Sequence, residues 1–139
     1  MKKSLPYKSY NSTKTVDELI FNLLNYELRI KSLKKELDFI LFVIDTAHFK
    51  EHVINLFEIL SVFKTDINDI NSTQNIVLNK ISKTSKILYQ KRECEDLVCD
   101  DFFIKDYERL EKEILHFMDS ATNLKADVIQ YLQSVIIAK

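Results

Sequence analysis

The feature that most constrains this chain is a series of apolar residues spaced alternately four and three positions apart. From Leu19 to Ala47 this spacing selects nine positions, and all nine are apolar or aromatic. A second series runs from Phe49 to Leu88, and a third, from Phe103 to Ala138, is apolar or aromatic at each of its eleven positions. Because residues at this spacing share one face of an α-helix, the pattern predicts long amphipathic helices that pack through these faces.

Glycine is absent from the sequence, and the single proline, Pro6, lies close to its start. Glycine allows positive φ in tight turns and lets the backbone approach phosphates. Walker loops, dinucleotide-binding glycine motifs and G-x-S-x-G nucleophile elbows are therefore excluded. At 139 residues, with 46% apolar and 29% charged positions, the chain has the size and composition of one ordinary domain. We predict an all-α fold, an elongated antiparallel bundle of three to four long amphipathic helices with coiled-coil-like packing.

The N-terminal residues differ from the rest of the chain. Residues 1–13 are polar, basic and aperiodic, which predicts a flexible basic arm. Thr15 and Glu18 have the spacing of a capping box, so a helix should begin there. Residues 14–139 are then predicted to form a single helical bundle domain.

The apolar series is interrupted at two places. Its register changes after Ala47, which predicts a turn near 46–48. A second interruption covers 93–101, where five acidic residues occur with no basic one. Acidic residues at the end of this stretch suit the start of the last helix, because they can accept hydrogen bonds from its first N–H groups.

The middle of the chain allows two interpretations. Short polar residues cluster between Asp66 and Thr73, and Gln74 interrupts the apolar series. Because such side chains favour turns and helix starts, we expect a break near 69–72. One continuous helix from 49 to 91 is the alternative. With the break, the predicted helices cover approximately 15–46, 49–69, 72–92 and 102–138.

More apolar residues accompany the series than one face of a helix holds. Those that we expect to stay partly exposed on the first and last helices are Phe39, Phe42, Val43, Ile129, Ile136 and Ile137. Contiguous exposed apolar surface marks interaction sites. We therefore interpret the chain as a non-enzymatic interaction, scaffold or assembly subunit that acts through its bundle faces. The expected partner is a protein, most simply a second copy in a homodimer, and no cofactor is implied.

An alternative function involves Arg109 and His116, which have the spacing Arg-x6-His. This pair resembles the signature of HEPN-type ribonucleases, small helical bundles that act as dimers. The resemblance implies that the two side chains aid attack by a ribose 2′-hydroxyl, with the histidine as general acid or base. The sequence departs from that family at Leu110, where a polar residue is usual.

A third hypothesis is a metal-binding or sensing bundle that uses His48 and His52. On a helix, residues four apart share a face, which is suitable spacing for zinc ligands. Cys94 and Cys99 are five apart and would diverge by about 140° on a helix, which is poor geometry for one metal ion. Of these four possible ligands, only the two histidines therefore have suitable spacing.

Charge and hydropathy limit the partners and the location. The net charge is −1, and the basic run from Ile76 to Arg92 is typical of a solvated helix face, so we do not expect a nucleic-acid partner. The longest apolar run, Phe39–Ile44, has six residues, far fewer than the ~20 of a membrane-spanning helix. With no apolar segment after Lys2 and Lys3 and no disulfide framework, we predict a cytoplasmic protein with no membrane span.

Overall fold

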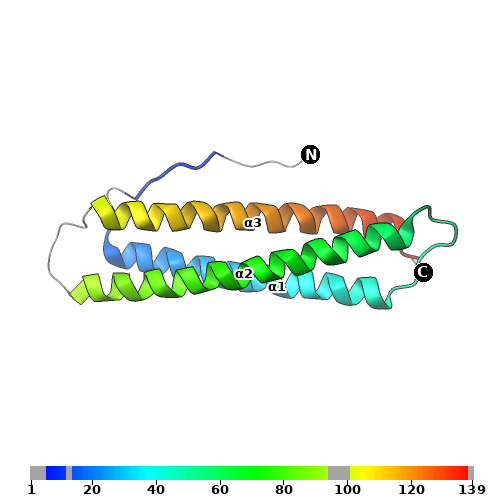
Figure 1. The fold of residues 1–139 in the computed structure, drawn as a ribbon, viewed down its shortest axis with the longest axis horizontal. Coiled ribbons are helices and arrows are strands. Elements are labelled where there is room, and N and C mark those ends of the chain that lie inside the picture. Colours follow the sequence, from blue (N-terminus) through cyan, green and yellow to red (C-terminus); the bar gives the residue numbers. More distant parts are fainter. Residues whose placement is uncertain (1–5, 12–13, 94–100, 138–139) are drawn as a thin grey trace.

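Three long helices lie side by side and form an elongated bundle (Figure 1). The computed structural model describes residues 6–11, 14–93 and 101–137. The helices are α1 (Val16–Thr46), α2 (Leu56–Glu93) and α3 (Asp101–Val135). Helix α2 runs antiparallel to α1 and α3, and each helix packs against the other two. The prediction of an all-α bundle is confirmed, with three helices in the described residues.

The apolar series identified in the sequence form the core of the bundle. Each helix turns its series inward, and the largest of the fully buried members are Leu19, Leu23, Ile30 and Leu37 of α1, Ile67, Ile81 and Leu88 of α2, and Tyr107, Ile114 and Val128 of α3. Full burial of one aliphatic side chain stabilises a fold by about 1.5–3 kcal/mol. The spacing of the apolar residues therefore determines which side of each helix faces its neighbours.

Helix α1 begins with the predicted capping box. The Glu18 backbone N–H donates to Thr15 Oγ1 at 3.2 Å, and the Thr15 backbone N–H donates to Glu18 Oε1 at 3.2 Å. These reciprocal bonds satisfy two N–H groups that a helix start would otherwise leave without partners. The helix ends at Thr46, where the change of register predicts a turn.

Helix α2 continues through the segment where the sequence predicts a break, so the break near 69–72 and the division into four helices are wrong. The hydroxyls of Ser72 and Thr73 donate to the carbonyl oxygens of Asn68 and Asp69 at 3.1 Å. Each bond reaches back one turn of the helix, which is how short polar side chains are accommodated in a helix interior.

The polar residues of this segment also serve the packing of α2 on α1. The Asn71 amide donates to Asp38 Oδ1 across the interface at 3.3 Å. Gln74 is buried at a core position between Ile67 and Val77. The buried face of α2 therefore continues past the polar cluster, which favours one helix over two.

The connection between α1 and α2 is longer than the sequence predicts, because α2 begins at Leu56 and not near 49. Phe49 instead pairs with Ile136 in an isolated antiparallel bridge. The Lys50 N–H donates to the Val135 carbonyl at 2.8 Å, and the Ile137 N–H donates to the His48 carbonyl at 3.0 Å. His52 and Asn55 have φ of 63° and 58°, which is incompatible with a right-handed helix.

Part of the predicted flexible arm lies against α3. The Tyr7 hydroxyl donates to Glu111 Oε1 at 2.9 Å, and the Asn11 amide donates to the same oxygen at 3.2 Å. Asn11 is almost fully buried. Residues 6–11 of the predicted arm therefore contact the bundle, whereas residues 1–5 and 12–13 lie outside the described residues.

Candidate functional site

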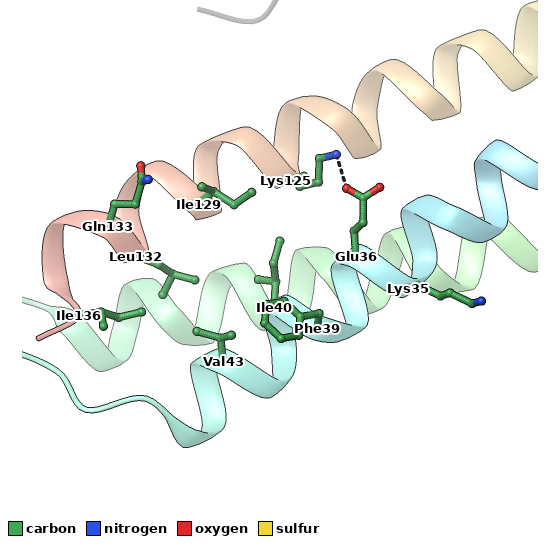
Figure 2. A pocket seen from close by; sticks show the side chains of 10 residues that line it. All are labelled: Lys35, Glu36, Phe39, Ile40, Val43, Lys125, Ile129, Leu132, Gln133 and Ile136. Carbon is green, nitrogen blue, oxygen red and sulfur yellow. Dashed lines mark hydrogen bonds and ion pairs between the residues drawn. The ribbon is translucent and has the colours of Figure 1, made fainter. Parts of the chain in front are cut away.

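An apolar groove of about 830 Å³ lies between the C-terminal halves of α1 and α3 (Figure 2). The two helices run in the same direction, so the C-terminal halves of both lie at the same end of the bundle. The lining residues are Lys35, Glu36, Phe39, Ile40 and Val43 from α1, and Lys125, Ile129, Leu132, Gln133 and Ile136 from α3 or the residue after it.

Four of the six residues that the sequence singles out for interaction meet in this groove. Phe39 and Val43 are one turn apart on α1, and Ile129 and Ile136 are two turns apart along the α3 side. Their side chains lie around the same hollow in Figure 2. Phe39 is 62% exposed and Ile129 is 40% exposed, so a large part of this apolar surface meets solvent.

The other two predicted residues lie beside the groove. The Phe42 ring is 6.3 Å from the Phe39 ring between centroids and is itself mostly exposed. Ile137 follows α3, and its side chain is half exposed next to the bridge with the 47–55 connection. Sequence reasoning missed Ile40 and Leu132 as groove residues, because both are buried and contribute to the core as well.

An ion pair joins the two walls toward the middle of the bundle. Lys125 Nζ lies 2.6 Å from Glu36 Oε2, and both side chains are partly exposed (Figure 2). An exposed pair of this kind contributes at most about 1 kcal/mol, so packing and not charge holds the walls together. With Lys35 and Gln133, the pair makes a polar edge around an apolar interior.

The lining of the groove is mostly apolar, and four of its residues are polar or charged. Its ten lining residues include no serine, cysteine, histidine or threonine. The only carboxylate, Glu36, is paired with Lys125.

A second organised cluster, around Glu111, was not predicted from the sequence. The Glu111 side chain is almost fully buried and accepts hydrogen bonds from Tyr26 at 3.0 Å and Tyr107 at 3.1 Å, in addition to those from Tyr7 and Asn11. The only signal in the sequence is the spacing of Tyr107 and Glu111, which are one helical turn apart.

Burial and the neighbouring carboxylate keep the tyrosines of this cluster neutral. Burial and the charge of Glu111 raise the pKa of Tyr26 to about 12. Burial also raises the pKa of Tyr7 and Tyr107 well above the usual value for tyrosine. Neutral phenols keep the proton that they donate to Glu111, so the cluster fastens residues 6–11 and α1 to α3.

Arg109 and His116 are both exposed on α3, but they line different hollows. Arg109 donates to Asp106 at 3.3 Å and lies near Lys80 and Lys83. His116 lies instead in a hollow beside the N-terminal segment, and the two hollows have no residue in common. Seven residues of helix separate the pair by about 10 Å along the axis.

His48 and His52 lie in the connection between α1 and α2 and not on a helix, so the shared helical face predicted for them is wrong. Both are exposed, and the His52 side chain is 95% accessible. Among the described residues, no group of three or more His, Cys, Asp and Glu side chains is arranged to hold a metal ion. Cys94 and Cys99 lie outside the described residues.

None of the described helices is both long and apolar enough to cross a bilayer. Comparison of the chain with protein families, with curated proteins and with solved structures found no match.

Proposed function

We propose that the protein is a non-enzymatic helical interaction or assembly subunit that binds a protein partner in the groove between α1 and α3. The observation that carries the proposal is the groove itself, where two helices leave Phe39 and Ile129 substantially exposed around an apolar hollow. Large apolar side chains grouped in this way provide the anchors that dominate binding energy in protein interfaces.

The shape and chemistry of the groove favour a helical partner. Its walls are two parallel helices, and a third helix can lie along them with its apolar face inward. The polar edge formed by Lys35, Glu36 and Lys125 would remain at the rim, where it contributes to specificity more than to affinity.

Self-association and a cytoplasmic location belong to the same proposal. A second copy is the simplest partner, since most assemblies of soluble proteins are symmetric homo-oligomers. The cytoplasmic location rests on the low cysteine content, two residues in 139. We do not propose the ribonuclease or the metal-binding function, because no observation of the described residues favours either.

The test is affinity capture from cells that naturally contain the protein, followed by mass spectrometry. Three tagged forms are compared: the unchanged chain, Val43→Glu in the groove, and Ile76→Glu on the exposed side of α2. We expect Val43→Glu to lose a partner that the other two forms recover, either another protein or the untagged native chain, which is distinguished from the tagged form by its size. A charge in the groove would be unpaired once the partner excludes water. Recovery of the same proteins by all three forms contradicts the proposal.

A further inference from the structure

Helix α1 carries apolar side chains on two opposite faces. One face belongs to the core and includes Leu23 and Ile30. The other is exposed, with 43–68% of each side chain accessible at Phe21, Leu24, Leu28, Phe39 and Phe42. At about 100° per residue these five fall within a sector of about 60° on the side of the helix opposite the core. A helix that packs on one core needs one apolar face, so the second face calls for a partner.

The exposed face of α1 divides into two clusters. The first comprises Phe21, Leu24 and Leu28, and the second comprises Phe39 and Phe42 with the partly buried Val43 beside them. The second cluster forms one wall of the groove, since Phe39 and Val43 line it opposite Ile129. From the start of the first cluster to the end of the second is about 33 Å along the helix.

The two clusters are symmetric about the middle of the helix. Leu24 and Phe39 lie eight and seven positions from Ser32, and Phe21 and Phe42 lie eleven and ten positions from it. If a second α1 lies antiparallel with its centre at Ser32, each cluster of one helix meets the other cluster of its neighbour. Ser32 is small and exposed, so it allows the helices to approach at this point.

We propose that the occupant of the groove is a second copy of this chain, bound through α1 in a two-fold antiparallel dimer. The Phe21–Leu28 cluster of each copy lies against Phe39, Val43 and Ile129 of the other. The same contact forms twice, as in every isologous interface. This inference rests on the proposed function and identifies the partner for the same groove.

The position of Lys35 favours the antiparallel orientation. At about 100° per residue, Lys35 falls within the same sector of α1 as Leu24 and Phe39, and it is exposed. A parallel pairing would set Lys35 of one copy against Lys35 of the other, and these like charges repel. With the two-fold axis near Ser32, Lys35 of one copy lies instead within about 2 Å of the height of Leu28 of the other.

Charge substitutions in the two clusters test the orientation by analytical ultracentrifugation. The variants are Leu24→Glu, Phe39→Lys and the control Ile76→Glu, which places a charge on the exposed side of α2. We expect the unchanged chain and the control to form dimers. Each cluster variant alone should dissociate about 30-fold more readily, or more, as expected for loss of a hot-spot residue.

Mixing the two cluster variants is the decisive step. In the antiparallel heterodimer, one contact keeps Leu24 against Phe39, and the other brings the new glutamate against the new lysine. We therefore expect the mixture to form a dimer at concentrations where each variant alone is monomeric. Circular dichroism should show the same helical content in all samples, which confirms that the variants are folded. A monomeric unchanged chain, a dimer insensitive to both substitutions, or a mixture that stays monomeric overturns the proposal.

Cross-linking gives a second measurement that does not depend on charged variants. In a chain with Cys94→Ser and Cys99→Ser, Ser32→Cys should join two copies through a short bis-maleimide, because Ser32 lies at the axis. The matched control is Ser82→Cys, an exposed position on α2. Equal cross-linking at both positions, or none at Ser32→Cys, argues against the dimer. The capture experiment on Val43→Glu remains informative in that case, since a different protein in the groove would still be lost.

Discussion

The interface between α1 and α3 differs at its two ends in whether other residues of the chain cover it. At the end where both helices begin, Tyr26 of α1 meets Glu111 of α3, and residues 6–11 lie over the contact. Tyr7 and Asn11 supply the hydrogen bonds that the carboxylate still needs. At this end the chain buries a polar group and satisfies it with its own side chains.

At the opposite end the same two helices leave an apolar groove. Phe39 and Ile129 line it, and no described residue lies across it as residues 6–11 lie across Glu111. The 47–55 connection pairs with the end of α3 through backbone hydrogen bonds and does not fill the groove. The chain therefore covers one end of this interface with its own residues and leaves apolar surface exposed at the other.

The largest effect on stability is expected from a core residue next to Glu111, at the end of the bundle where α1 and α3 begin (the polar end). Leu110→Ala removes a side chain that is 5% exposed and should lower the free energy of unfolding by about 2–5 kcal/mol. Urea unfolding followed by circular dichroism measures it. A loss under about 1 kcal/mol would mean that this face of α3 is not the buried one.

The next effect concerns the carboxylate itself. Glu111→Ala leaves the hydroxyls of Tyr26 and Tyr107 and the contacts of residues 6–11 without their acceptor, so we expect a loss of about 2–3 kcal/mol. Hydrogen exchange should show faster opening of residues 6–11. The control is Glu113→Ala, whose exposed ion pair with Lys80 contributes about 1 kcal/mol at most. If Glu111→Ala and Glu113→Ala lowered the free energy of unfolding equally, the Glu111 cluster would not stabilise its end of the bundle.

Alkaline pH should weaken the polar end selectively. The pKa of Tyr26 rises from 10.0 to about 12 on folding, so the folded chain holds this proton where the unfolded chain releases it. The resulting contribution to stability is fully present below pH 10 and is lost as the pH rises toward 12. Phenolate absorbance and urea midpoints measured across this range test it. Tyr26→Phe should reduce the late-titrating absorbance, and an unchanged titration would contradict the assignment.

The smallest effect is expected in the groove. Phe39→Ser, studied at low protein concentration, should change the free energy of unfolding by no more than about 0.5 kcal/mol, because the ring is mostly exposed. Urea unfolding followed by circular dichroism measures this change as well. A loss comparable with that of Leu110→Ala would show that the groove end supports the fold, and the contrast between the two ends would disappear.

Sequence spacing predicted the parts of this protein that depend on one helix at a time. The positions of Leu23, Ile30 and Ile114 in the apolar series identified them as core, and Thr15 with Glu18 identified the start of α1. The same reasoning selected Phe39 and Ile129 as surplus apolar residues. Local patterns determine these features because a helix fixes the angular position of every side chain about its own axis.

The tertiary structure decided which helix faces meet. Only the packing of α1 beside α3 brings Val43 and Ile136 into one groove, and only the return of the N-terminal segment places Tyr7 beside Glu111. The continuity of α2 past Ser72 likewise depends on its burial against α1, which outweighs the local preference for a turn. Spacing along a helix carries no information on its neighbours, since contacts between distant segments are set by packing over the whole bundle.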